Sequence, residues 1–379
     1  MPITSGNIHS DARRPACRKY KRNFMPQQIF ELSLAELRQQ LAAWQQPAYR
    51  AAQLWSGLYS DLRSSFEEFS VLPRGLRTQL SATYDIECLQ LKLMRESKDG
   101  HTRKWLFGLA GGGEVETVVM AYDERMTVCI STQAGCAMGC VFCATGQMGL
   151  LRNLTAGEIV AQVIWAARSL KAVGGRLTNI VVMGMGEPFH NYEATMAALD
   201  RLQDPAGFGI GVRRITVSTV GLPHMIRRFA QEGRHEKLAV SLHAATDALR
   251  NRLVPINKRY PLAEVIDACR EYVRGGNRRL SMEWALIDGQ NDSAEQAQLL
   301  VELVQGLGCH VNLIPLNPTG GYAGLRTGRE AADRFKSVLD TGGVACTIRV
   351  RRGIDIGAGC GQLRTKAAGG KAQPALASI

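Results

Sequence analysis

The sequence predicts an α/β protein whose main part is a partial (β/α)6 barrel. Apolar segments of strand length alternate with segments of helical periodicity from residue 123 to about residue 352. A chain of 379 residues, 45% of them hydrophobic, is long enough for such a barrel and a smaller domain. Repeated strand and helix units build a parallel sheet, and so long a series favours an open or partial barrel over a doubly wound sheet.

The chain before the barrel divides into three parts. Residues 1–26 carry many charges and no periodic apolar pattern, which predicts a flexible basic arm. Residues 27–88 have apolar side chains at helical spacing and are expected to form a small N-terminal helical accessory domain. Residues 89–122 contain short alternating runs separated by glycine-containing turns, which predict a short antiparallel β extension.

Residues 123–363 are the predicted barrel core with its C-terminal catalytic segment, and residues 364–379 are predicted to form a flexible tail. We expect strands at residues 127–131, 179–183, 215–219, 238–242, 280–287, 311–316 and 344–350. Helices are expected around residues 155–171, 190–203, 223–232, 261–274, 293–307 and 328–341, the first of them opened by a capping box. Functional side chains are therefore expected where these strands end.

Three closely spaced cysteines, Cys136, Cys140 and Cys143, follow the first of these strands. Structural zinc sites and ferredoxin-type clusters use four ligands, so a run of three leaves one coordination position open. The alternatives are three cysteines without a common ligand, or a zinc site completed by a distant residue. The C-x3-C-x-aromatic-C form, with Phe142 before the last cysteine, resembles the loop with which radical S-adenosylmethionine (SAM) enzymes bind one [4Fe-4S] cluster.

Glycines and polar residues follow other predicted strands. Gly186 and Glu187 lie in Gly184-Met-Gly-Glu-Pro188, where the backbone can approach a ligand and the carboxylate can accept from an ammonium group. This segment resembles the one that holds the SAM amino group in radical SAM enzymes, although a plain turn would also use glycines. The remaining candidates for contacts to a bound nucleoside are Ser218, Ser241, Leu242, His243 and Asn317.

The formal charge of +12 makes a polyanionic partner plausible, because lysines and arginines that neutralise phosphates release counterions. Surface charge without a partner is the simpler alternative. Ten scattered cysteines indicate a reducing compartment rather than a disulfide scaffold. We find no signal segment and no apolar run long enough to cross a membrane, and we expect a cytoplasmic protein.

Two further cysteines extend the pattern: Cys129 precedes the cysteine loop, and Cys360 lies in Gly359-Cys-Gly-Gln-Leu363. With these, residues 27–363 resemble the RlmN/Cfr-type radical SAM RNA methyltransferases, above all the RlmN type. Other matching segments are Gln46–Trp55, Glu116-Thr-Val and Arg152-Asn-Leu154. The resemblance implies methylation of adenosine C2 in 23S rRNA and in tRNA. It also implies a [4Fe-4S] cluster, SAM, and an electron donor such as flavodoxin or ferredoxin.

The resemblance further implies catalytic roles. Cys360 would carry the methyl group, Glu116 would remove a proton, and Cys129 would attack the Cys360 sulfur, which leaves a disulfide. Two alternatives remain: a Cfr-type enzyme that methylates adenine C8, and a non-catalytic metal-bearing RNA-binding protein. The chain departs from the family pattern at Val220 and at His190-Asn191, which bears on RNA preference rather than on the chemistry.

Overall fold

A single ten-stranded sheet organises the part of the chain that the computed structural model describes, residues 27–276 and 279–364. The strand order is β14-β13-β12-β11-β10-β9-β6-β5-β4-β3. The predicted arm at residues 1–26 lies outside these described residues, as does the predicted tail apart from Arg364.

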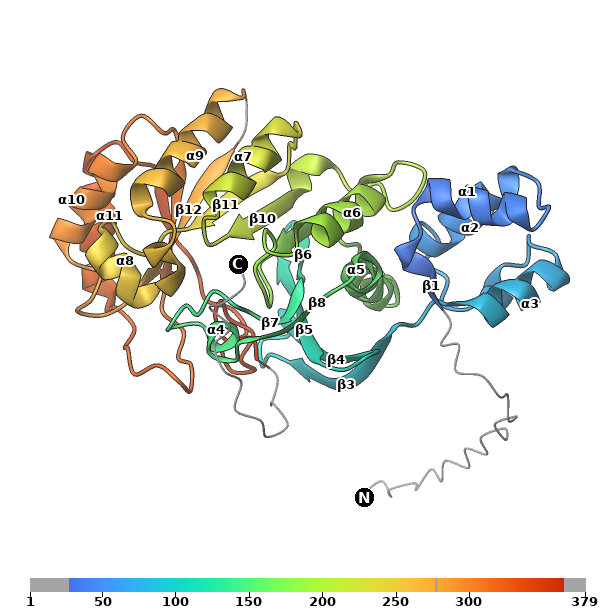
Figure 1. Ribbon diagram of the computed structural model, residues 1–379. Helices are drawn as coiled ribbons and strands as arrows, with labels where there is room; N and C mark the ends of the chain where they lie inside the picture. Colours follow the sequence, from blue (N-terminus) through green and yellow to red (C-terminus); the bar gives the residue numbers. More distant parts are fainter. Residues whose placement is uncertain (1–26, 277–278, 365–379) are drawn as a thin grey trace, which may run out of the picture.

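The barrel part of the sheet is parallel throughout. Its strands are β6 (Arg125–Cys129), β9 (Asn179–Val182), β10 (Ile215–Thr219), β11 (Lys237–Ser241), β12 (Leu280–Leu286), β13 (His310–Pro315) and β14 (Cys346–Ile348). The helices between them are α5 (Ala156–Lys171), α6 (Tyr192–Gln203), α7 (Pro223–Gln231), α9 (Leu262–Arg274), α10 (Ala294–Leu303) and α11 (Arg329–Thr341), and they lie along the outside of the sheet (Figure 1). Neighbours in the sheet follow chain order without a reversal, which confirms the predicted open barrel over a doubly wound sheet.

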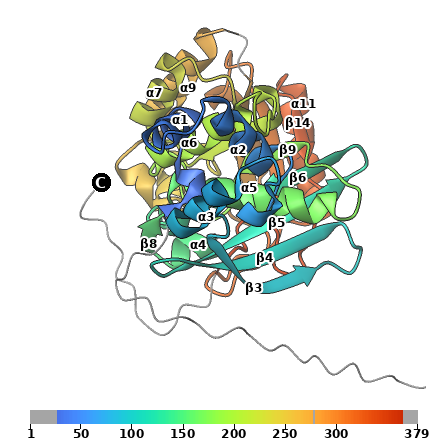
Figure 2. The same ribbon diagram turned by 90° about the vertical axis from the view of Figure 1, so that its right-hand side faces the viewer.

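The predicted antiparallel extension continues the same sheet beyond β6. Strands β3 (Leu89–Glu96), β4 (Thr102–Leu109) and β5 (Glu114–Tyr122) pair in sequence, and β3 is the edge strand (Figure 2). Helix α5 covers the outer face here, where the rings of Phe107 and Trp165 meet edge to face at 5.2 Å. The inner face of β4 and β5 is therefore left for the C-terminal segment.

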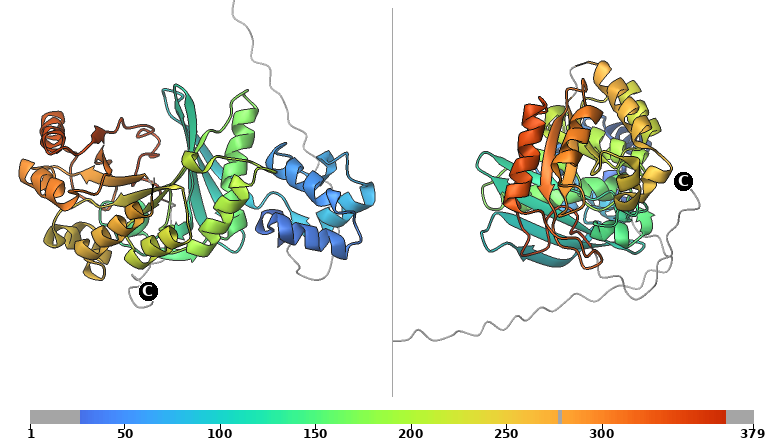
Figure 3. Two further views of the ribbon diagram at one scale, coloured as in Figure 1. Left: turned by 90° about the horizontal axis from the view of Figure 1, so that it is seen from above. Right: turned by 90° about the vertical axis from the view of Figure 1, so that its left-hand side faces the viewer.

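The N-terminal helices form a separate layer beside α5. They are α1 (Leu34–Ala43), α2 (Tyr49–Tyr59) and α3 (Arg74–Thr83), and Figure 3 shows them at the end of the molecule opposite α10 and α11. A capping box at Ser33 starts α1, and the tiny parallel pair β1 (Gln27–Gln28) and β2 (Tyr84–Asp85) closes the module. The domain boundaries at residues 88 and 122 stay predictions.

Short elements in the loops escaped the sequence analysis. They are the hairpin β7 (Gln133–Gly135) and β8 (Leu150–Asn153), the helices α4 (Ala144–Gln147) and α8 (Asp247–Leu253), and the 3-10 turns η1 (Ile29–Glu31), η2 (Phe66–Glu68), η3 (Val212–Arg214) and η4 (Pro255–Lys258). Each is too short to show a periodic pattern. The hairpin and α4 flank the cysteine loop.

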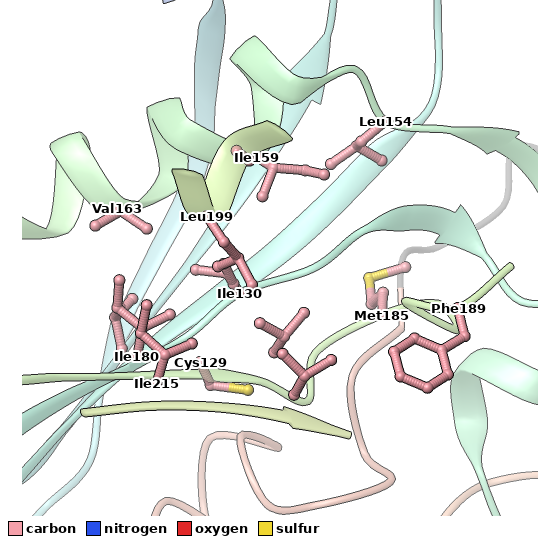
Figure 4. Packing of buried hydrophobic residues seen from close by; sticks show 14 of the residues in the cluster. Cys129, Ile130, Leu154, Ile159, Val163, Ile180, Met185, Phe189, Leu199 and Ile215 are labelled. Carbon is pink, nitrogen blue, oxygen red and sulfur yellow. The ribbon is translucent and has the colours of Figure 1, made fainter. Parts of the chain in front are cut away.

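The apolar core lies between the sheet and its outer helices. Ile159 and Val163 of α5 and Leu199 of α6 pack over Ile180 and Ile215 of the strands (Figure 4). Alternate side chains of a strand point to opposite faces, so the other half of each strand faces the interior of the barrel. No helix in the described ranges is long and apolar enough to cross a membrane.

Candidate active site

The register of the strands places three polar side chains on the inner face of the sheet. Cys129 and Glu116 were predicted site residues, and Lys104 was not. Cys129 of β6 pairs with Val118 of β5, and Val118 pairs with Lys104 of β4. Glu116 lies two residues before Val118 and so shares its face. Cys129, Glu116 and Lys104 therefore point to the same side, the interior of the barrel.

The C-terminal segment crosses this inner face and is bonded at both ends. On one side Ala144 N donates to Gly361 O at 2.8 Å and Thr145 Oγ1 donates to Leu363 O at 2.6 Å. On the other side Lys104 Nζ donates to Gly357 O at 2.9 Å. Cys360, distant in sequence, thus lies between the cysteine loop and the antiparallel extension.

A buried ion pair forms the second attachment of this segment. Glu116 Oε1 lies 2.8 Å from Lys104 Nζ, and Glu116 Oε2 accepts from Arg364 N at 3.0 Å. The residues are 5% and 9% exposed. Burial raises the pKa of Glu116, while its bonds to Lys104 and Arg364 act in the opposite direction. The predicted proton acceptor is therefore engaged on both oxygens.

The two outlying thiols differ in their surroundings. Cys129 is buried, and its pKa is raised to about 12. Desolvation is the larger cause, and the nearby Cys360 adds to it. Cys360 is accessible to solvent, yet the protein surrounds it closely enough for desolvation to raise its pKa as well. The positive charge of Arg349 opposes both shifts. Arg349 thus favours the thiolate form of either cysteine.

Both cysteines are free thiols, so the disulfide predicted between Cys129 and Cys360 is not supported as a bond of the resting protein. The family resemblance implies a disulfide that forms during turnover, and this bond stays a prediction.

The loop of Cys136, Cys140 and Cys143 is held by the β7–β8 hairpin and by its own turn. Cys136 N donates to Gly149 O at 2.9 Å and Cys143 N donates to Cys140 O at 3.1 Å. Burial raises the pKa of Cys136 and raises that of Cys140 to about 12, and the neighbouring thiols of the loop add to both shifts. Within the described ranges no three His, Cys, Asp or Glu side chains gather closely enough to bind one metal ion.

Glu187 is a buried carboxylate without a cationic partner among the residues described. It is 3% exposed, and its oxygens accept from Phe189 N at 3.0 Å and from Val220 N at 2.8 Å. Burial raises its pKa to about 7 against the effect of these bonds. Gly186 before it has φ +104, and a Cβ there would lie 2.6 Å from the Gln133 Cβ.

The other predicted residues lie at neighbouring strand ends, as expected for parallel strands. Ser218 and Ser241 are half-buried, and Leu242 is fully buried. His243 has φ +61 and packs edge to face on Phe142 of the cysteine loop, with ring centroids 4.8 Å apart. Its Nδ1 accepts from Ala285 N, and burial lowers its pKa to about 3, so the imidazole is neutral.

Asn317 connects the strand ends to the segment that contains Cys360. Its Nδ2 donates to Cys360 O at 3.0 Å, whereas its Oδ1 is buried and has no hydrogen-bond partner among the described residues. An unpaired buried oxygen of this kind is costly, which makes it a candidate acceptor for a ligand.

Two relatives identify the family. A "Probable dual-specificity RNA methyltransferase RlmN" of Chloroflexus aurantiacus is 48% identical over 88% of this chain and 92% of its own length. A "Dual-specificity RNA methyltransferase RlmN 1" of Myxococcus xanthus is 50% identical over 89% of this chain and 94% of its own length. The chain belongs to the RlmN family.

Two further comparisons agree with this assignment. Residues 130–301 match the radical SAM superfamily model. A crystal structure of a radical SAM methyltransferase from Sphaerobacter thermophilus superposes with a TM-score of 0.88 at 51% identity, and covers 89% of this chain and 99% of that one. Members of the family bind a [4Fe-4S] cluster and SAM, and the chain is accordingly a SAM-dependent RNA methyltransferase. The comparisons do not support the alternative of a non-catalytic RNA-binding protein.

The structure explains why the departures from the RlmN pattern are tolerated. Val220 contributes its backbone N to Glu187, so its side chain is not needed for this bond. Asn191 Nδ2 donates to Thr132 O at 2.9 Å and to Leu154 O at 2.8 Å, and His190 Nδ1 lies 3.0 Å from Gln133 Nε2. The polar pair at 190–191 therefore ties the Gly-Glu-Pro turn to the base of the cysteine loop.

Sequence reasoning missed Arg250, a fully buried cation in this RlmN family member. Its guanidinium donates to Val220 O at 2.6 Å, Leu242 O at 3.0 Å and Asn257 Oδ1 at 2.8 Å. It thus joins the C-terminal ends of β10 and β11, and its charge acts against the raised pKa of Cys140. An arginine on the apolar side of the short helix α8 is the signal that could have revealed it.

Proposed function

We propose that this enzyme methylates C2 of an adenosine in 23S rRNA and in tRNA, with Cys360 as the carrier of the methyl group. The observation that carries the proposal is the placement of Cys360, which is bonded through its neighbours to the cysteine loop and to Glu116, and through its own carbonyl to Asn317. A cysteine without a catalytic role would not need three elements to hold its loop inside a barrel.

The described residues fit the cofactors of the family. Three thiols on one loop suit a cluster that keeps a free iron, and we assign Cys136, Cys140 and Cys143 as its ligands. A cubane binds each cysteine through a different iron, so its ligands need not gather as closely as those of a single ion. The buried Glu187 carboxylate lacks a cation, which the ammonium group of SAM would supply. Asn317 Oδ1, at the end of β13, offers a further buried acceptor without a partner among the described residues.

Four other residues complete the assigned SAM site, Ser218, Ser241, Leu242 and His243, together with the backbone at Gly186. Neutral His243 and buried Leu242 give the pocket an apolar wall, and the two serines offer hydroxyl groups. When bound, the cluster and SAM supply the electron and the 5′-deoxyadenosyl radical that a polar mechanism lacks.

Cys360 acts first as a nucleophile. Its thiolate attacks the methyl carbon of one SAM, so that a carbon–sulfur bond forms at Cys360 while the methyl–sulfonium bond breaks and S-adenosylhomocysteine leaves. Arg349 favours this thiolate electrostatically. The methyl group then gives one hydrogen atom to the 5′-deoxyadenosyl radical, which becomes 5′-deoxyadenosine. The resulting carbon radical adds to C2, an electron-poor carbon that electrophilic SAM itself would not methylate.

Glu116 and Cys129 complete the cycle from the inner face of the sheet. We assign Glu116 the removal of the proton from the adduct, which requires that one of its oxygens leave its present partner, Lys104 or Arg364 N. The adduct is a radical, so one electron must also leave it, and the bound cluster would take up this electron. Cys129 then attacks the Cys360 sulfur as a thiolate, the carbon–sulfur bond breaks, and the departing carbon takes up a proton to give the methylated base. The two cysteines become a disulfide, which a two-electron reductant must open.

The finer choice of substrate rests on the names of the relatives, which are of the RlmN and not the Cfr type. Incubation with a 23S rRNA fragment or tRNA, SAM and reduced flavodoxin, followed by nucleoside mass spectrometry, tests it. We expect 2-methyladenosine in both RNAs, whereas 8-methyladenosine would assign the Cfr-type reaction. We infer a cytoplasmic enzyme that receives electrons from a flavodoxin or ferredoxin, since its RNA substrates and reductant are found there.

A further inference from the structure

The N-terminal ends of the barrel strands carry a ring of basic side chains. In a parallel sheet these ends meet at one edge, opposite the edge that bears Glu187, His243 and Asn317. Each residue starts a strand or directly precedes one, in β6, β10, β11, β12 and β13. We call these residues the cationic rim: Arg125, Arg214, Lys237, Arg279 and His310.

Part of the rim borders a cavity of about 510 Å³. Lys237, Arg279 and His310 line it at the rim, and the inner-face residues Thr216 and Asn312 line it farther in. Arg349 also lines the cavity, where its Nη1 lies 3.9 Å from Glu283 Oε2. Glu283 is the one acidic residue of the lining, and it faces Arg349. It therefore does not neutralise the positive charge of the cationic rim.

The rim cations repel one another. No salt bridge joins Arg125, Arg214, Lys237 or Arg279 to a carboxylate in the described part of the chain. Burial is the main cause that lowers the pKa of Lys237, and the positive charges of Arg279, Arg125 and Arg214 add to this effect. Unpaired cations around a cavity lower the stability of the empty protein, and an anion that enters the mouth would remove the repulsion.

The lining of the cavity reaches Val181, which pairs with Cys129 across the sheet. Register places Cys129, Val181, Thr216 and Lys237 in one row across four neighbouring strands. Three strand spacings amount to about 14 Å along the sheet. Arg349, at the inner end of the cavity, acts electrostatically on both Cys129 and Cys360.

We propose that the cationic rim is the entrance for RNA: backbone phosphates bind Lys237, Arg279 and their neighbours, and the target adenosine swings into the cavity toward Cys360. This inference rests on the proposed function, because it takes the opposite strand ends to be occupied by SAM. An adenosine must leave its stack to expose C2, and the phosphates flanking an extruded nucleotide remain outside the pocket that receives its base.

The test compares Lys237→Gln/Arg279→Gln with Arg329→Gln/Arg334→Gln, a control on α11 with the same change in charge at highly exposed side chains. Affinity for a 23S rRNA fragment is measured over a range of salt concentrations. We expect the rim variant to lose at least tenfold in affinity at moderate salt. Its plot of log affinity against log salt should become shallower by about 1.4 to 1.8 for two lost phosphate contacts.

The control should keep the affinity and salt slope of the wild type, and Lys237→Arg should keep most of both because it retains the charge. Equal losses in rim and control variants, or a rim variant with unchanged affinity and slope, would overturn the proposal.

Two further readouts separate this proposal from the proposed function and from misfolding. The melting temperature of Lys237→Gln/Arg279→Gln should equal or exceed that of the wild type, because repulsion is removed. Methylation of Cys360 by SAM, followed by peptide mass spectrometry without RNA, does not involve the rim. If wild-type Cys360 carried no methyl group after incubation with SAM, the proposed role of Cys360 would be contradicted. The comparison of RNA affinities would still decide the role of the rim.

Discussion

Replacing Lys104 by Met should release the segment that carries Cys360. The substitution keeps the length of the side chain but removes the partner of Glu116 Oε1 and the donor to Gly357 O. Residues 357–364 then keep their bonds to Asn317, to Pro318 O and to the cysteine loop, and the bond from Arg364 N to Glu116, but lose their attachment to β4.

The size of the effect follows from the burial of the pair. Removal of one member of a buried ion pair costs about 3 to 5 kcal/mol, because the other charge is left without compensation. Opening of the segment admits water to Glu116, so we take the lower end, about 3 kcal/mol. At 1.4 kcal/mol per factor of ten, the open state should become roughly a hundredfold more populated.

Hydrogen exchange followed by mass spectrometry measures this opening directly. We expect the peptide that contains Cys360 to exchange roughly a hundredfold faster in Lys104→Met, while peptides of α9 and α10 are unchanged. Alkylation of Cys360 should accelerate in parallel. Lys92→Met, on the exposed edge strand, is the matched control and should exchange as the wild type does.

The effect should also depend on pH. Burial raises the folded-state pKa of Glu116 above its ordinary value, so its ionisation destabilises the folded state increasingly as pH rises through that pKa. Loss of Lys104 raises this pKa further. The excess opening should therefore be larger at pH 8 than at pH 6, after correction for intrinsic exchange, and Lys104→Met/Glu116→Gln should remove the difference. An exchange rate of the Cys360 peptide that matches the wild type at both pH values would refute the role of the pair.

Three other substitutions probe the cofactor side of the site. Single replacement by Ala of a cluster cysteine should abolish iron binding and 5′-deoxyadenosine formation; full iron content in any such variant would contradict the assignment to Cys136, Cys140 and Cys143. Gly186→Ala should weaken SAM binding and lower stability by about 1 to 3 kcal/mol, because φ is +104 and the new Cβ would meet Gln133 at 2.6 Å; equilibrium dialysis with SAM checks this. Arg250→Met should cost about 3 kcal/mol or more in thermal unfolding, because three carbonyl oxygens of β10, β11 and their loops lose a buried donor; an unchanged melting temperature would refute this.

Local pattern was sufficient to predict the fold and to single out the three loop cysteines, whose role as cluster ligands stays a prediction. The alternation of apolar runs located the barrel strands to within a few residues, because each strand buries one face under a helix. Cys136, Cys140 and Cys143 stand within eight residues, so their association needs no tertiary information.

Contacts between distant segments could not be predicted in this way. Lys104 looks like one polar residue of an alternating strand, and nothing near it in sequence announces Gly357 or Arg364. The cationic rim comes from residues spread over almost half the chain, and only the parallel order of the strands brings them to one edge. Such sites depend on register, which a single sequence does not show.

The reaction of RNA with Cys129→Ala is the most direct test of the account. Without the resolving thiol, Cys360 should still acquire its methyl group and add to the adenine, and the adduct should then persist. We predict a covalent protein–RNA species on a denaturing gel, which nuclease reduces to an adenosine linked through a methylene group to Cys360. Cys269→Ala, which removes a buried cysteine of α9, should turn over normally. Ordinary turnover by Cys129→Ala, with RNA-free enzyme recovered, would contradict the account.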